Sequence, residues 1–374
     1  MKRIPIEQAR LLQSIAEHRA EREHRKEFKR KSLLKNNNDE KKVKPPNDYN
    51  DWPELLLPEK FSLARNYDEV INAISQVRKA IIGRRLYINF DAIRQIDAAA
   101  VLMLAAELEI VKFYNKPSKM VTNNSNWNPK VRSLLKQVGF LELLSSGSKI
   151  SSHTESTKRK VFVKFKSGNK VIGETVRQII ENLKGNVTAG ELSPDLILHL
   201  YAGIGEATIN TFHHAHNDDH KYLNDELNRW WISASIDKKT NKIEVVCYDR
   251  GATIPITIRN SDKKWKGVQF FWQGLFEQYS DGEIIHAAME LTRTSTNLEE
   301  RGKGLPELLR LIDQNNQGIL RIYSGTGMAE FAPIQKRKKP KFAKLSQKMR
   351  GTLVEWSIIL SSSTKETSQN GIPH

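Results

Sequence analysis

Cysteine is almost absent from this sequence, which has one, Cys247, among 374 residues. A single cysteine cannot form an intrachain disulfide, and it cannot build a multi-cysteine zinc site. Cys247 lies in an apolar, strand-like segment, so we expect an inert core thiol. The sequence therefore excludes disulfide-stabilised scaffolds and cysteine zinc sites.

Long apolar runs are also missing. No stretch approaches the ~18 consecutive apolar residues that a membrane-spanning helix needs. The first residues, MKRIPIEQARLLQ, are basic but lack the apolar stretch and small-residue cleavage site of a secretory signal. We therefore expect a soluble cytoplasmic protein without membrane contact.

Positive charge is abundant and unevenly spread. The formal net charge is +17; residues 1–45 hold 14 Lys and Arg against 7 Asp and Glu, and residues 336–350 hold 8 against none. Such runs favour an acidic partner, such as nucleic acid or a phosphorylated ligand, but they are also typical of solvated flexible segments. Nucleic-acid binding through residues 2–44 and 336–350 stays open.

The length favours two or three domains, and polar stretches indicate their boundaries. We predict a basic helical or flexible segment over residues 1–48, a first domain over 49–150, a second over 151–362 and a flexible tail over 363–374. In the first domain, a strand pattern at 86–90 precedes an apolar helix at 98–113, and a further helix opens at Pro129. This alternation indicates an α/β fold.

The second domain also mixes strands and helices. Its predicted strands are residues 161–165, WWISASID and KIEVVCYDRG; its predicted helices are residues 173–183, a helix capped by Ser193 with Pro194 at its first position, and GLPELLRLIDQN. We predict that QGILRIYSGTGMAEF forms a hairpin turning at Gly325–Gly327. A basic loop over 336–350 and a last strand, GTLVEWSIIL, are expected to follow.

A polar cluster lies in the helix that follows Pro194. Glu206 and Asn210 are four residues apart, so they share one helix face. A carboxamide oxygen can bind hydrated Mg²⁺, and a glutamate can deprotonate a water or a hydroxyl. Four histidines follow: His213, His214, His216 and His220. A metal site, one face of a nucleotide pocket and a solvated helix end are all open interpretations.

Three further motifs follow in order. Asp249 ends a strand and Gly251 permits a tight turn after it; a buried carboxylate there can accept the exocyclic amine of adenine. From Arg301, RGKGLPELLRLI is a glycine-rich loop leading into a helix, and its backbone amides can face phosphates. RGTLVEW places Thr352 at the start of a strand.

Together, the four motifs resemble those of the GHKL ATPase superfamily, which includes gyrase and the histidine kinases. EATINTFHH is similar to that family's Glu-x-x-x-Asn-x-x-x-His box, DRGATIP to its Asp-x-Gly-x-Gly box, GKGL to its second glycine box and GT to its closing Gly-Thr. The resemblance spans roughly residues 160–361. It implies an α/β sandwich of the Bergerat type that binds ATP and Mg²⁺.

The resemblance also implies roles for individual residues. Glu206 would be the general base, Asn210 the Mg²⁺ ligand and Asp249 the adenine-binding carboxylate. The other nucleotide-binding residues that it implies are His214, Gly251, Gly302, Lys303, Gly304 and Thr352. The glycines of the second box would flank the phosphates in a lid, and the threonine would support the adenine-binding carboxylate.

Two positions depart from the family pattern. Thr253 stands where a second glycine is usual, and Pro306 stands where a glycine or small residue often follows Gly-Leu. Both departures bear on the geometry of the turn and the lid more than on adenine binding.

The first domain carries a second resemblance, over about residues 55–145. YINFDAIRQIDAAAVLMLAAEL is similar to the STAS domain, the α/β fold of anti-sigma-factor antagonists. In those antagonists a phosphorylated Ser or Thr follows the aspartate, whereas Asp97 is followed by Ala98. We therefore expect a docking module for a protein partner rather than a phosphorylation switch.

Three functions fit these patterns. The first is an ATP-binding regulatory protein, a Mg²⁺-dependent conformational switch with slow ATP hydrolysis. The second is an anti-sigma-type serine/threonine kinase in which Glu206 deprotonates a partner's hydroxyl. The third is a nucleic-acid-associated factor that uses the basic segments. The first is our leading interpretation, and a homodimer is left open.

Overall fold

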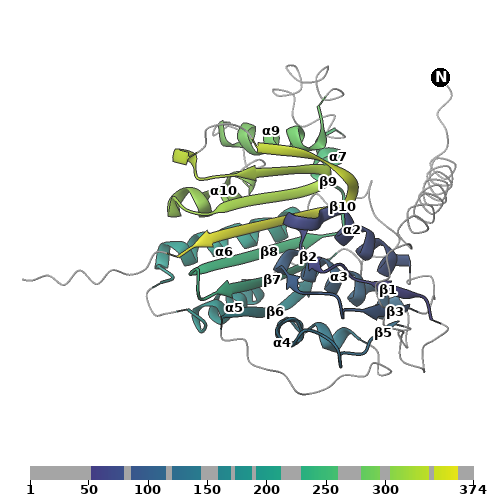
Figure 1. Ribbon diagram of the computed structural model, residues 1–374. Coiled ribbons are helices and arrows are strands. Elements are labelled where there is room, and N and C mark those ends of the chain that lie inside the picture. Colours follow the sequence, from purple (N-terminus) through teal and green to yellow (C-terminus); the bar gives the residue numbers. More distant parts are fainter. Residues whose placement is uncertain are drawn as a thin grey trace, which may run out of the picture. The chain divides into compact units, whose positions relative to one another are not determined.

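The computed structural model describes residues 52–79, 86–114, 120–144, 159–169, 173–187, 191–211, 229–259, 279–294, 304–336 and 341–360. All the described residues belong to one compact unit. Helices and strands alternate in it, so the fold is α/β, as predicted (Figure 1). No helix in the described ranges is both long and apolar enough to cross a membrane.

The first described region is a small α/β layer. Its strands are β1 (Glu54–Leu56), β2 (Lys60–Phe61), β3 (Leu86–Asn89), β4 (Gln95–Ile96) and β5 (Met120–Val121). Its helices are α2 (Leu63–Lys79), α3 (Ala98–Tyr114), α4 (Pro129–Gln137) and the 3₁₀ helix η3 (Phe140–Leu143). The strands pair in parallel in the order β1-β3-β5, with β2 and β4 as a separate parallel pair. The strand and the two helices predicted in this region are confirmed.

A larger antiparallel sheet follows. Its strands are β6 (Lys160–Gly168), β7 (Trp230–Asp237), β8 (Lys242–Asp249), β9 (Ile319–Phe331) and β10 (Lys341–Ile359). They lie in the order β6-β7-β8-β10-β9, and every neighbouring pair is antiparallel. The helices of this part are α5 (Gly173–Lys184), α6 (Pro194–Asn210), α7 (Ile254–Arg259), α9 (Asp281–Thr294) and α10 (Gly304–Asn315).

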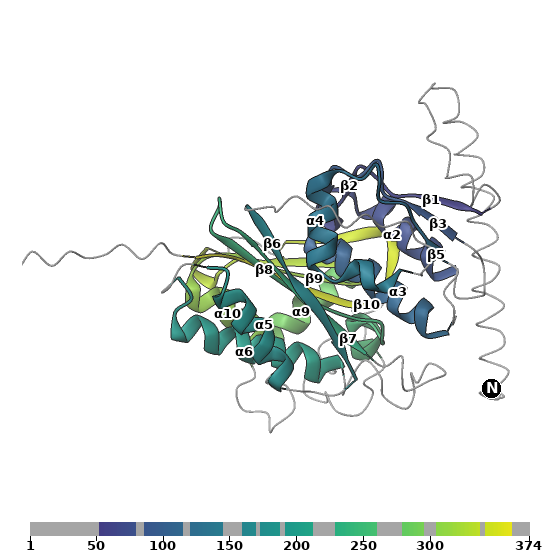
Figure 2. The ribbon, with the colours of Figure 1, turned by 90° about the horizontal axis from the view of Figure 1, so that it is seen from below.

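Both faces of this sheet are apolar, and this sets the layering. Along β8, Val246 and Tyr248 belong to one hydrophobic cluster, whereas Val245 and Cys247 belong to another. Successive side chains of a strand point to opposite faces, so the two clusters lie on opposite sides of the sheet. The first cluster includes residues of α2 and α3, and the second includes residues of α5, α6, α9 and α10. Figure 2 shows helices on both sides of the sheet.

Helix α3 is buried all round because its sequence is apolar all round. The carboxylate of Asp97 caps it by accepting the Ala100 amide at 2.7 Å. All side chains from Ala98 to Ala106 are buried. Helix α3 packs against α2 and η3 of its own layer and against β7 and β8 of the larger sheet. It therefore lies between the two layers and shares its core with both.

The predicted hairpin at Gly325–Gly327 is wrong, because β9 runs through these glycines as one strand of 13 residues. A Cβ added to Gly327 would lie 2.3 Å from the amide nitrogen of Gly282 in α9. Asp281, at the start of α9, accepts both the amide and the hydroxyl of Thr326 at 2.8 Å. The glycines let the start of α9 approach the strand closely; they do not form a turn.

The predicted basic loop over 336–350 is also wrong in most of its length. Strand β10 begins at Lys341 and pairs with β9. Lys344 and Lys348 are exposed, Leu345 packs against the first hydrophobic cluster and Met349 is buried within it. This alternation is typical of a half-buried strand. The last strand therefore starts ten residues before the predicted Gly351.

Candidate nucleotide-binding site

Helix α6 carries the first predicted site residues. Ser193 caps it by accepting the Leu196 amide at 3.1 Å, and Pro194 is its first residue, as the sequence predicts. Its core-facing side chains, all buried, are Leu196, Leu200, Ile204 and Ala207. Glu206 and Asn210 lie beside this apolar stripe, and the Asn210 amide hydrogen-bonds the Glu206 carboxylate. The two residues therefore share a helix face, as their spacing predicts.

The Glu206 carboxyl is partly buried. Burial raises its pKa, the hydrogen bond from Asn210 opposes that rise, and the nearby Glu307 carboxylate adds to it. A carboxylate with a raised pKa binds a proton more strongly. Glu206 thus has the chemistry of a general base, beside an amide side chain that can supply a neutral oxygen ligand.

Asp249 is the second part of the candidate site. It ends β8, is 8% exposed and accepts the Gly251 amide at 2.8 Å through Oδ1. Burial raises the pKa of Asp249 to about 7, although the backbone amides of Gly251 and Thr352 both hydrogen-bond its carboxyl and lower it. This buried carboxyl is held in place by two backbone donors. Either protonation state is accessible to it near neutral pH.

The segment Gly351–Thr352 of β10 lies directly against Asp249. Gly351 has φ +76, and a Cβ added there would lie 1.9 Å from the Asp249 carbonyl oxygen. The hydroxyls of Thr352 and Ser324 are 2.8 Å apart, and the Ser324 hydroxyl also accepts the Ile254 amide at 2.9 Å. Asp249, Gly251 and Thr352 are therefore brought together, and a serine that the sequence analysis did not single out joins them.

Thr253 has a structural role in this turn. Its Oγ1 accepts the Ile256 amide at 3.4 Å, and its carbonyl accepts the Thr257 amide at 2.9 Å. Ser and Thr are favoured helix N-caps, so Thr253 starts α7. The departure from the motif gives the turn a helix cap and keeps the contact of Asp249 with Gly251.

The structure describes only the end of the glycine-rich RGKGL segment. Gly304 is the first residue of α10, and Pro306 lies in the first turn of that helix. Helix α10 packs on α6, and the Trp356 indole donates to the Leu308 carbonyl at 2.8 Å. Seven residues named in the sequence analysis lie outside the described ranges: Arg301, Gly302, Lys303, His213, His214, His216 and His220. The basic residues 2–44 lie outside them too.

Sequence reasoning missed Arg250 and Glu107. Arg250 lies between Asp249 and Gly251, and its Nε is 3.2 Å from Oε1 of Glu107 in α3. Glu107 also accepts two hydrogen bonds from Arg78, at 2.6 and 3.3 Å. The available signal was a glutamate inside an apolar helix, because a fully buried charge needs a partner.

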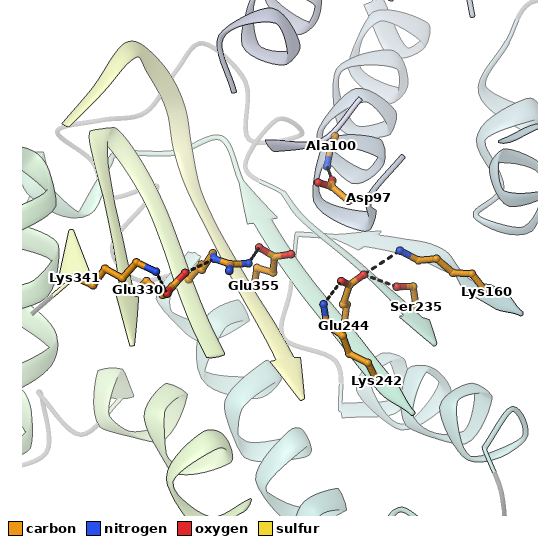
Figure 3. A network of polar contacts seen from close by, with 10 residues as sticks. Asp97, Ala100, Lys160, Ser235, Lys242, Glu244, Glu330, Lys341 and Glu355 are labelled. Atoms are coloured by element: carbon orange, nitrogen blue, oxygen red, sulfur yellow. Dashed lines mark hydrogen bonds and ion pairs between the residues drawn. The ribbon is translucent and has the colours of Figure 1, made fainter. Parts of the chain in front are cut away.

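A second ionic network lies on the face of the larger sheet that packs against α3 (Figure 3). Arg321 joins Glu330 at 2.7 Å and Glu355 at 3.7 Å, and Glu330 also pairs with Lys341. Burial and the carboxylates of Asp97 and Glu244 raise the pKa of Glu355 to about 7, against the effect of Arg321. Glu355 is thus a second carboxyl that titrates near neutral pH.

Glu244 of the same network behaves in the opposite way. It accepts hydrogen bonds from Lys160 at 3.2 Å and from Lys242 and Ser235 at 2.8 Å. Burial raises its pKa, but these partners outweigh burial and hold the pKa at about 2. Glu244 therefore stays ionised and adds to the repulsion that Glu355 experiences.

Comparison with known proteins adds no assignment. No protein-family model matches the chain, and no curated protein matches it. Among the described residues, no group of three or more His, Cys, Asp or Glu side chains could hold a metal ion. The candidate site therefore depends on its own geometry and on the resemblance of its motifs.

Proposed function

We propose that this protein is an ATP-binding regulatory protein, a Mg²⁺-dependent switch that hydrolyses ATP slowly. The observation that carries the proposal is the buried Asp249 carboxyl, held by the Gly251 and Thr352 amides at the end of β8. A carboxylate fixed in this way is a suitable acceptor for the exocyclic amine of adenine. Its neighbours, the Thr352 and Ser324 hydroxyls, are polar groups that also suit a purine base.

The residues on α6 suit the phosphate end of the same ligand. Bound ATP with Mg²⁺ would supply a transferable phosphoryl group. Asn210 offers an amide oxygen of the kind that Mg²⁺ accepts beside phosphate oxygens. Glu206 would accept the proton of the attacking water, because its raised pKa makes it a stronger base than an exposed glutamate. Helix α6 packs against β8, the strand that Asp249 ends, which supports assigning the residues of both elements to one site.

The proposal extends the resemblance to both layers. The larger sheet with its helices would be a Bergerat-type ATP-binding domain, and the first α/β layer would be STAS-like. Gly302, Lys303 and Gly304 would form the lid, and His214 would lie on the phosphate side. Asp97 caps α3 from a half-buried position and is followed by Ala98, so this layer offers no acceptor hydroxyl there.

The test follows γ-labelled ATP with Mg²⁺ and the purified full chain. Wild type should bind ATP and release labelled phosphate slowly. Asp249→Asn should lose binding, and Glu206→Ala should bind ATP but release no phosphate. Asp237→Asn is the control for Asp249, because Asp237 also ends a strand but hydrogen-bonds the amides of its own β-turn.

The result distinguishes the possible functions. Normal ATP binding by Asp249→Asn would overturn the adenine assignment. Binding without phosphate release, followed by label transfer to an added protein, would identify the serine/threonine kinase instead. No binding by wild type would overturn the proposal.

A further inference from the structure

Glu107 is a carboxylate with no exposure to solvent in the middle of α3. Burial alone would raise its pKa, but Arg78, Arg250 and Arg350 together hold the pKa below its ordinary value. An uncompensated charge at this position would cost several kcal/mol, so the arginines are needed to keep it ionised. Arg78 of α2 and Arg250 of the turn after β8 therefore pair directly with Glu107, and the charge of Arg350 in β10 adds to their effect.

Two of those arginines adjoin the candidate nucleotide site. Arg250 separates Asp249 from Gly251, the residue whose amide binds the Asp249 carboxyl. Arg350 precedes Gly351–Thr352, and its carbonyl accepts the Tyr248 hydroxyl at 3.0 Å. One of the two segments that supply amide donors to Asp249 therefore carries Arg250, which pairs directly with Glu107. The other follows Arg350, whose positive charge also acts on Glu107.

Successive side chains of β8 point to opposite faces of the sheet, so Asp249 and Arg250 point to different sides. Cys247 belongs to the cluster on the α6 side, and Tyr248 belongs to the cluster on the α3 side. Arg250 continues the Tyr248 side and is 7% exposed. Its Nε lies 3.2 Å from Glu107 but forms no aligned hydrogen bond, so charge attraction is the main link between them.

We propose that Glu107 is a positioning residue for the nucleotide site. From α3 it fixes the Asp249 turn through its ion pair with Arg250. The packing of α3 thereby controls nucleotide affinity, and a bound nucleotide stabilises that packing in return. This inference rests on the proposed function for its ligand, although the link between Glu107 and the turn can be measured without one.

The first measurement is amide hydrogen exchange at Gly251 and Thr352 without nucleotide, in wild type and Glu107→Gln. Exchange should be about ten-fold faster in the variant, because the turn loses its ionic anchor. Glu109→Gln is the matched control: Glu109 lies on the same helix but binds the Trp231 indole at 2.5 Å and the Ser167 hydroxyl at 2.9 Å. Its exchange at the two amides should equal that of wild type.

The second measurement is the Kd for an ATP analogue in the same proteins. Glu107→Gln should bind about ten-fold more weakly, which corresponds to about 1.4 kcal/mol, and Glu109→Gln should bind normally. Arg250→Met leaves Glu107 paired with Arg78 and tests the link from the other side if Glu107→Gln fails to fold. In the Glu107→Gln, Arg250→Met double variant the losses of affinity should be less than additive. In the Glu109→Gln, Arg250→Met double variant the loss of affinity should equal that of Arg250→Met alone.

Unchanged exchange and affinity in Glu107→Gln would overturn the inference, as would equal effects in Glu109→Gln. If wild type binds no nucleotide but exchange responds to Glu107 as expected, the proposed function fails and the positioning link stands. If wild type binds nucleotide and neither measurement responds to Glu107, the link fails and the proposed function stands.

Discussion

Burial moves two carboxyl groups of the sheet into the neutral pH range. The pKa of both Asp249 and Glu355 is raised to about 7, with burial as the main cause in each case. Asp249 has two backbone donors, and Glu355 has Arg321 at 3.7 Å and nearby carboxylates that repel it. The first arrangement suits a ligand that donates a hydrogen bond, and the second makes folding stability sensitive to pH.

Glu355→Gln should stabilise the protein in alkaline solution. The pKa of Glu355 is raised from 4.5 to about 7 on folding, so the folded state binds the proton more tightly. Stability from this group is therefore highest below the unfolded-state pKa and falls as pH rises to about 7, by up to about 3 kcal/mol. At pH 8 the variant should be more stable than wild type in urea unfolding, and at pH 4 this advantage should be absent.

Glu330→Gln provides the opposite case in the same network. Burial raises the pKa of Glu330, but Lys341 and Arg321 outweigh it and hold the pKa below its ordinary value. Its ionised form therefore contributes stability that is present above the ordinary pKa and is lost in acid. This variant should be less stable than wild type at pH 8. A Glu355→Gln protein that is also less stable at pH 8 would contradict the assigned repulsion.

At the scale of single residues, the sequence predicts contacts between residues that belong to one short motif or to motifs of one known pattern. The i,i+4 spacing of Glu206 and Asn210 is sufficient to place them on one face, and the motif resemblance paired Asp249 with Thr352. The sequence could not predict the ion pair of Arg250 with Glu107, because these two residues lie in segments far apart in the chain. A buried glutamate indicates that a cation is near it, but not which of 60 lysines and arginines that is.

Strand β10 has an irregular centre where it passes the candidate site. Its pairing with β9 shifts register between Lys344 and Met349 and again between Met349 and Thr352. Gly351 takes a positive φ at this bulge and lies directly on the Asp249 backbone. The irregularity brings the Thr352 amide to the Asp249 carboxyl, so the shape of the strand is part of the site.

Gly351→Ala should therefore weaken both folding and nucleotide binding. A left-handed alanine costs about 1–2 kcal/mol, and its Cβ would lie 1.9 Å from the Asp249 carbonyl oxygen. Thermal unfolding and the Kd for an ATP analogue measure the two effects. Gly205→Ala is the control, because a Cβ added there meets nothing within 4 Å.

The control variant Gly205→Ala should itself change the stability in a known direction. Gly205 lies within α6, where alanine is favoured over glycine by roughly 0.5–1 kcal/mol. Gly205→Ala should raise the melting temperature slightly. If Gly351→Ala leaves both melting temperature and affinity at wild-type values, the close packing of Gly351 on Asp249 is wrong.

The sequence predicted helices and strands correctly where local signals are unambiguous. It failed where a contact with a distant part of the chain determines the conformation. Ser193 and Pro194 mark the start of α6 by local chemistry alone. The glycines at 325 and 327 are compatible with a turn or with a close neighbour, and the neighbour, α9, could not be inferred from the sequence. In residues 341–350 the lysines give a strong positive charge, which obscures the alternation of exposed and partly buried side chains along the strand.

At the scale of the whole molecule, the two layers share one hydrophobic cluster. Side chains of the larger sheet, including Trp231, Tyr248 and Leu353, pack with those of α3 and the first layer. Backbone contacts cross the same boundary: the Phe165 amide donates to the Val138 carbonyl at 3.1 Å. Removing the first layer would expose a large apolar face of the sheet.

The two layers should unfold together. We expect one calorimetric transition for the full chain, because a shared core couples them. A fragment of residues 151–374 should bind a hydrophobic dye and associate, since contiguous exposed apolar surface promotes both. A monomeric fragment that binds no dye, or two separate transitions in the full chain, would contradict this expectation.

The order of the sheet has a consequence for synthesis on the ribosome. Strand β10 follows all the other strands of the described ranges, yet it lies between β8 and β9. Until it emerges, β8 and β9 lack their common neighbour, and Asp249 lacks the Thr352 amide. The nascent chain therefore cannot complete the candidate site until almost all of the sheet has been translated. A premature stop before Thr352 should yield a product without the site.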